Sequence, residues 1–393
     1  MEFAMGWSQF NLTLLGVWPE PRKVSNISRA ISSLVFWSTT FVTFMFICVP
    51  QTANLILKST SQDEVIENLS INIPIFFALA KQIVLWYYKN DLALLLRQIL
   101  DDWSEPISGP DRKMMLKTAK LSRMISIFCS TLAYIMLFAF ISLQIWSNME
   151  NSSEADLGGL LHPATFPYDT KKSPNFEITW FGQFIGTTLM AICYSCVDTF
   201  FAVLVLHLCG QLTVLRAALE NLANATKEND FAKFQERLAF IVCRHNQLSR
   251  FAVIVEDCFN LTLLVQILIG TAMLCLTGYR MLSSVGEEDA DLPVVGLIFY
   301  ILHVICTMLH LFIYCYVGEA LVTESTGLGQ STYDCNWYDL PPKQAVSLVL
   351  IICRAKVSFQ ITAGKFSPFS LKLFSAVIKT SAGYLSVLRA MKT

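Results

Sequence analysis

The sequence predicts an all-α membrane protein with seven transmembrane helices, a cytoplasmic N-terminus and an extracellular C-terminus. Two features of its composition support this fold class: 54% of the 393 residues are hydrophobic and only 15% are charged, whereas soluble domains have about 25% charged residues. A third is that apolar stretches recur along the chain, and a membrane-spanning helix needs about 20 mainly apolar residues. The net charge of −1 gives no indication of a nucleic-acid partner.

Six stretches are long and apolar enough, or nearly so, to cross a membrane. They are Ile31–Val49, Ile71–Tyr88, Met124–Trp146, Ile178–Leu208, Cys258–Tyr279 and Leu292–Gly318. The seventh unit is divided into an amphipathic helix, Gln344–Thr362, and a polar span, Pro368–Met391. The N-terminal residues MEFAMGWSQF lack the basic and apolar regions of a cleaved signal peptide. We therefore expect the first span to act as its own signal.

Lysine and arginine residues set the predicted orientation, because loops rich in them stay in the cytoplasm. Sixteen lie in the N-terminal arm and in the second-to-third and fourth-to-fifth connections, against four in the alternate loops. This bias places the N-terminus inside, the reverse of a G-protein-coupled receptor. The fourth-to-fifth connection keeps a helical period. We therefore expect both spans to extend into the cytoplasm as helices joined near Asn229–Asp230.

These observations divide the chain into six regions. They are a cytoplasmic arm (1–30), helices 1–4 (31–208), a cytoplasmic anchor formed by extensions of helices 4 and 5 (209–257), helices 5–6 (258–318), an anchor segment with the amphipathic helix (319–366) and the terminal helix (367–393).

Neither a metal site nor an enzyme active site is indicated. Most of the twelve cysteines fall in apolar segments or basic loops, as small packing residues do. His303 and His310 lie seven residues apart, but a metal would need more ligands. No phosphate-binding loop, HExxH or GxSxG motif is present. We therefore predict no cofactor, no metal and no enzymatic activity.

Two short segments carry a family resemblance. Residues 333–342 read YDCNWYDLPP before the amphipathic helix and the polar span, and residues 14–21 read LLGVWPEP. With seven spans and an inside N-terminus, the whole chain resembles the insect odorant receptors, which are ligand-gated cation channels. Within the terminal span, Leu373, Phe374, Tyr384, Val387 and Leu388 are similar to the matching stretch of the co-receptor Orco.

The same comparison shows departures from Orco. Gly383 stands where Thr is usual, Ala390 stands where a polar residue is common, and the long intracellular insertion is missing. The chain therefore resembles a ligand-tuning subunit. The resemblance implies a heterotetramer with Orco around a pore lined by the last helix, contacts between subunits in the cytoplasmic anchor, and a plasma-membrane location in olfactory neuron dendrites. It also implies that each subunit has an odorant pocket in its outer half.

The terminal helix has a stripe of small and polar residues. Thr380, Gly383, Val387 and Ala390 share one face by their i, i+3, i+7, i+10 spacing. Such a stripe suits a water-filled pore, which an apolar ring at Val387 can close by dewetting. Small residues also let membrane helices approach closely, so a packing seam is the alternative; the resemblance favours the pore.

A site for a small volatile ligand should be apolar and aromatic with one or two polar groups. The resemblance implies pocket helices 2, 3, 4 and 6. The candidates in their outer halves are Ile73, Phe76, Phe77, Phe138, Ser142, Trp146, Phe184, Thr188, Met190, Phe299, Tyr300 and His303. An ordinary packing role is the alternative for each stripe.

Two charged residues inside the spans and two asparagines in outer loops give further predictions. Lys81 and Asp198 place charges inside the second and fourth spans, which is costly unless they pair; we expect a mutual ion pair, with snorkelling to the inner interface as the alternative. Asn68 and Asn151 lie in glycosylation sequons of predicted outer loops.

The sequence thus predicts an odorant-binding subunit of a non-selective cation channel formed with Orco. The first alternative is a gustatory-type channel that assembles without a co-receptor, although Gly383 and Ala390 break its expected terminal pattern. A metabotropic seven-helix chemoreceptor is opposed by the loop charges, and a transporter by the lack of an internal repeat.

Overall fold

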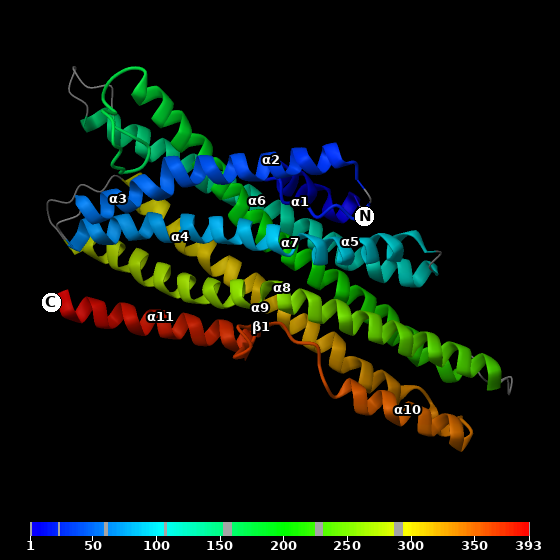
Figure 1. Cartoon of the computed structure of the whole chain (residues 1–393). Coiled ribbons are helices and arrows are strands. Elements are labelled where there is room, and N and C mark those ends of the chain that lie inside the picture. Colours follow the sequence, from blue (N-terminus) through cyan, green and yellow to red (C-terminus); the bar gives the residue numbers. More distant parts are fainter. Residues whose placement is uncertain are drawn as a thin grey trace.

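The computed structural model describes residues 2–22, 24–58, 62–105, 108–151, 159–224, 231–286 and 294–392. Within these ranges the chain is almost entirely helical (Figure 1). Six helical stretches are long and apolar enough to cross a membrane. Together with the terminal helix α11 (Leu371–Lys392) they make up the predicted seven-helix fold, which is confirmed.

The first span is interrupted by a π-helical turn. Helix α2 (Asn26–Thr43) passes through η1 (Phe44–Cys48) into α3 (Val49–Leu57). Pro50, at the start of α3, has no N–H group and cannot continue the α-helical ladder. The Val49 N–H instead bonds to Phe44 O, five residues back.

The long helices extend well beyond the predicted spans. These long helices are α4 (Gln62–Tyr87), α6 (Gly109–Asn151), α7 (Asn175–Asn224), α8 (Phe231–Gly286) and α9 (Val294–Asp334). The expected extensions of spans four and five are therefore present, but their junction at Asn229–Asp230 lies outside the described residues.

Helix α7 forms the centre of the molecule (Figure 1). Every side chain from Phe200 to Leu206 is buried, so this stretch is surrounded by protein on all sides. Residues 335–339, part of the segment that contributed to the family resemblance, form the turn after α9, including the short 3₁₀ helix η2 (Trp337–Asp339).

The two ends of the bundle differ. Figure 1 shows the end of α3, the start of α4 and the C-terminal end of α11 at one end of the bundle, whereas α10 (Pro342–Ala355) and the start of α8 lie at the opposite end. The fourth-to-fifth connection, which precedes α8 at this opposite end, is one of the segments that carry the excess of basic residues. That end therefore corresponds to the predicted cytoplasmic side.

Two helices lie where the sequence predicted an arm or a connection. Helix α1 (Glu2–Leu14) is part of the N-terminal arm. After it, Gly16 adopts φ +71°, and a Cβ there would come 2.5 Å from the Phe36 backbone nitrogen. Trp18 follows and packs edge-on against Phe200 of α7. The GVWP element thus docks the arm onto the core.

Helix α5 (Lys89–Ser104) occupies the second-to-third connection. Its residues Leu92, Leu95, Leu96 and Ile99 are buried at the i, i+3, i+4, i+7 spacing of an amphipathic helix. The connection is therefore an ordered cytoplasmic helix that packs along the bundle.

The predicted amphipathic helix is shorter than expected. It ends at Ala355, not Thr362, with Arg354 in its last turn, where a basic side chain is favourable, and the chain then turns back. Strands β1 (Thr362–Ala363) and β2 (Ser367–Pro368) form a small antiparallel hairpin before α11. The carboxylate of Glu256 on α8 accepts hydrogen bonds from both the backbone N–H and the hydroxyl of Thr362.

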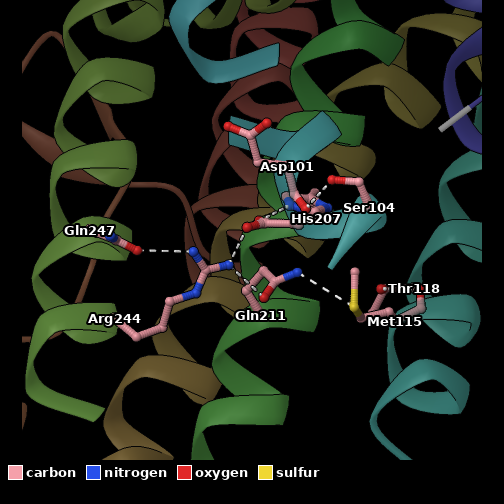
Figure 2. Close-up of polar contacts among 9 residues, drawn as sticks. Asp101, Ser104, Met115, Thr118, His207, Gln211, Arg244 and Gln247 are labelled. Atoms are coloured by element: carbon pink, nitrogen blue, oxygen red, sulfur yellow. Dashed lines mark hydrogen bonds and ion pairs between the residues drawn. The ribbon is translucent and has the colours of Figure 1, made fainter. Parts of the chain in front are cut away.

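A polar cluster joins three helices on the cytoplasmic side (Figure 2). Arg244 of α8 donates through Nη2 to Asp102 of α5 at 2.5 Å and to Gln211 of α7 at 2.8 Å. His207 of α7 contacts the other Asp102 oxygen at 2.9 Å. The Asp102 side chain is only 4% exposed, so it depends on these partners for compensation.

Replacing Arg244 by Met should therefore destabilise the cytoplasmic anchor. Because Arg244 is partly exposed and His207 stays with Asp102, we expect a loss of about 1–3 kcal/mol. Arg250→Met, an exposed arginine on the same helix, is the matched control and should change little. Thermal unfolding of the purified protein measures both; equal losses in the two variants would contradict the assignment.

Candidate ligand cavity and pore helix

An apolar cavity of about 250 Å³ lies in the outer half of the bundle. Five helices line it: α4, α6, α7, α8 and α9. Each of α4, α6, α7 and α9 contributes residues about one turn apart, such as Thr187, Met190 and Tyr194 on α7 and His303, Thr307 and His310 on α9. The cavity is smaller than the range of about 300–1,000 Å³ that is typical of drug-sized ligands, so it suits a small molecule.

The inner end of the cavity rests on a buried ion pair. Lys81 Nζ lies 2.5 Å from Asp198 Oδ1, and the two side chains are 1% and 6% exposed. The predicted pair is confirmed. The ammonium also lies 4.0 Å from the centroid of the Tyr194 ring, which lines the cavity. On α9, His310 Nε2 lies 4.0 Å from the other Asp198 oxygen.

The outer end is covered by the connection between α6 and α7. His162 in this loop stacks on Phe140 with ring centroids 5.1 Å apart, and its Nε2 lies 2.7 Å from Thr187 Oγ1. Both partners line the cavity. Thr165 ties the loop to the first span, because its backbone N–H donates to Pro50 O at 2.9 Å.

Helix α11 packs on α8 and α9 along one side only. Val377 and Ser381 are buried on this side, and a Cβ at Gly278 of α8 would lie 2.9 Å from Leu385. On the other side Val387 is 58% exposed, and a Cβ added at Gly383 would meet nothing within 4 Å. The predicted stripe is thus on the uncovered face. The side chain of its last member, Ala390, lies outside the described residues.

The sequence and the fold can both be compared with known proteins. A sequence model of the 7tm Odorant receptor family matches residues 61–382, most of the chain. The chain belongs to the insect odorant receptor family. Among its relatives in Drosophila melanogaster, odorant receptor 13a is 28% identical over 58% of this chain and 56% of its own length, and odorant receptor 10a is 22% identical over 80% and 79%. The chain spans about half the length of the first curated relatives it matches.

An odorant receptor coreceptor, from Harpegnathos saltator, is 30% identical over 42% of this receptor and 34% of its own length. The solved structure of insect olfactory receptor OR5 from Machilis hrabei in complex with eugenol has the same fold. Its TM-score is 0.83 with all of both chains covered, at 15% identity.

Three of the twelve predicted ligand residues of the receptor line the cavity: Met190, Phe299 and His303. The other nine do not. Ile73, Phe76 and Phe77 line a separate open groove between α3, α4 and α8. Phe138, Ser142 and Trp146 are exposed on the outer face of α6, and the cavity takes Met136, Leu137 and Phe140 in their place.

The remaining three predicted residues pack locally. Phe184 stacks on Trp180, and Thr188 donates to Phe184 O one turn back. The Arg280 guanidinium lies over the Tyr300 ring, 5.1 Å from the centroid of that ring. Periodicity extended from Met190 and His303 reaches Thr187, Tyr194 and His310, which sequence reasoning missed. No comparable periodicity in the sequence points to the α8 residues that also line the cavity.

The two glycosylation candidates differ. Asn68 lies in α4 with 6% exposure, and its Nδ2 donates to Glu64 O at 3.0 Å. This buried position disfavours a glycan there, because the loop expected from sequence is a helix. The side chain of Asn151 lies outside the described residues.

The hydrogen bonds of His162 determine its tautomer, and its burial determines its charge. Thr187 donates its hydroxyl proton to Gln183 O, so it can only accept from the His162 Nε2–H. The buried Nδ1 has no partner among the described residues. Burial lowers the pKa of His162 from 6.5 to about 3, and the ring is therefore neutral when the loop is closed.

Acidification outside the cell should consequently open this loop. Because the pKa in the closed loop is below the ordinary value, the closed form is fully favoured above pH 6.5 and loses about 1.4 kcal/mol per pH unit below it, until near the lowered pKa. The thiol of Leu161→Cys, at a site 0% exposed, should become more reactive to a maleimide, relative to a small free thiol at the same pH, as the pH falls from about 7 to about 5. Peptide-level mass spectrometry measures this, and His162→Gln should remove the effect. An unchanged pH dependence in that variant would contradict the assignment.

Proposed function

We propose that this receptor is the odorant-binding subunit of an odorant-gated, non-selective cation channel at the plasma membrane, formed with the Orco co-receptor. The observation that carries the proposal is the apolar cavity, because two of the helices that line it, α8 and α9, are also the helices on which α11 packs. A ligand in the cavity therefore contacts the supports of the pore helix directly.

The coupling is local. On α8, Met273 lines the cavity, and Cys275, two residues later, donates to Ser381 O of α11. On α9, His310 lines the cavity, and Phe312 packs edge-on against Phe374 of α11 at 5.6 Å. A small shift of either helix on ligand binding moves α11. The ligand biases gating only by binding the open arrangement better than the closed one.

The uncovered face of α11 supports a lumen-lining role. Thr380, Gly383 and Val387 would face the axis when subunits assemble, with Val387 as the narrow apolar ring. The similarity to coreceptors over 42% of the chain supports assembly with Orco. A structural relative in complex with eugenol supports a small organic ligand.

Whole-cell currents in cells expressing the receptor with and without Orco test the proposal against a broad odorant panel. We expect a prompt cation current only when both subunits are present. Current from this chain alone would favour the gustatory-type homomeric channel. A response that requires G protein and cytosolic messengers would overturn the channel mechanism.

A further inference from the structure

The polar groups of the cavity restrict the ligands that it can accept. The hydroxyl of Thr187 donates to Gln183 O, and that of Thr307 donates to His303 O, each within its own helix. The Tyr194 hydroxyl accepts from Gln266 Nε2 at 2.7 Å. The two threonine protons are therefore already donated and the tyrosine oxygen already accepts one bond, so these groups are less available to a ligand than a ring nitrogen without any hydrogen bond.

Of the two histidines in the lining, one is closed off. His310 Nδ1 lies 2.8 Å from Cys306 O, and its buried Nε2 faces Asp198. The other, His303, is only partly buried, and its ring packs edge-on against Phe299. In the described part of the chain, neither ring nitrogen of His303 has a hydrogen-bond partner. A neutral imidazole offers one donor and one acceptor.

The charge of the cavity is equally informative. No Asp, Glu, Lys or Arg is among its lining residues. The carboxylate nearest to the inner end, Asp198, is neutralised by Lys81. A charged ligand would lose its hydration without gaining a counter-ion, which is strongly unfavourable.

We propose that the cavity selects small, uncharged, oxygen-containing ligands, such as alcohols, phenols and carbonyl compounds, whose oxygen hydrogen-bonds to the imidazole of His303. This inference rests on the proposed function only in taking the cavity as the ligand site. His303 is then the residue that sets the preference for an oxygenated over a hydrocarbon ligand. The rest of the lining accommodates an apolar body.

Two sets of ligands, each matched in size and shape, test the proposal. One set is phenethyl alcohol, propylbenzene, phenethylamine and phenylacetic acid; a second is heptanol, octane, heptylamine and heptanoic acid. The shift in unfolding temperature of the purified full chain reports binding, and whole-cell current with Orco reports gating. We expect each alcohol to bind about threefold to tenfold more tightly than its hydrocarbon. The amine and the acid should bind more than about 100-fold more weakly than the alcohol at neutral pH.

Variants identify the responsible group. His303→Leu should remove the difference between alcohol and hydrocarbon by weakening only the alcohol, whereas His303→Gln, which keeps a donor and an acceptor, should retain it. Thr307→Val is the control: its hydroxyl is already bonded to the backbone, so the difference should persist.

The possible outcomes separate the two proposals. Binding with the expected preference but without current would overturn the channel function and support the ligand class. Current with equal potency for alcohol and hydrocarbon, or a preference that survives His303→Leu, would overturn the ligand class and leave the channel intact. If no compound of either set binds, the cavity is not a ligand site for this class and the inference fails.

Discussion

Asp198→Asn is expected to remove most of the folded receptor from the cell surface. The substitution leaves the Lys81 ammonium 1% exposed in a membrane span without its counter-ion. Breaking a buried pair from one side costs about 3–5 kcal/mol, a large part of the roughly 5–15 kcal/mol that stabilises a typical protein. The two aromatic rings over the ammonium, Phe77 and Tyr194, compensate only partly. Surface biotinylation and size-exclusion chromatography measure the loss.

The paired variants separate a charge effect from a packing effect. Exchanging the partners, Lys81→Asp with Asp198→Lys, should recover surface expression lost in either single reversal. The surface pair Lys172–Asp169 is the matched control, since its side chains are 78% and 49% exposed, and Asp169→Asn should leave expression unchanged. Single and double reversals that are equally impaired would show that the site needs these shapes and not this pairing.

The helical architecture was predictable because its signals are local. Each span needs its own apolar length, and each connection shows its own basic residues. The errors came where a helix does not depend on the membrane. Helix α5 is amphipathic and lies along the bundle. Its basic residues predicted only a cytoplasmic connection, although Leu92 and Leu96 also belong to an apolar stripe with helical spacing. The amphipathic helix before α11 was overextended because the hairpin at Thr362 is held by Glu256, more than a hundred residues away.

The site was harder to predict because lining a cavity depends on helix rotation. On α6, Leu137 lines the cavity and Phe138 is 74% exposed, a difference of one residue that periodicity alone does not resolve. The Lys81–Asp198 pair was accessible to sequence reasoning because two buried charges have few ways to be compensated. The neutrality of the cavity was not accessible to sequence reasoning, because it depends on the absence of charged side chains from the faces of five separate helices that line it.

Val387→Cys is expected to make the proposed channel sensitive to block from outside by a charged, impermeant thiol reagent. Val387 is 58% exposed on the uncovered face of α11 and would form the narrowest ring of the assembled pore. Attaching a positive charge there places it in the path of cations, so most of the ligand-evoked current should disappear. Thr380→Cys lies about two turns further from the outer end. It should be modified only while ligand holds the channel open, if the Val387 ring is the gate.

The same experiment distinguishes a pore from a packing seam. A residue facing lipid or a neighbouring helix does not ionise its thiol readily and would not react with a charged reagent. Ser381→Cys, on the same helix but 7% exposed against α8 and α9, is the matched control and should stay unmodified. The two exposed native cysteines in the described chain, Cys243 and Cys353, belong to the first part of α8 and to α10, on the predicted cytoplasmic side, and are not reached from outside. Modification of Ser381→Cys without modification of Val387→Cys would mean that α11 is rotated in the assembled channel and that its stripe of small residues serves helix packing.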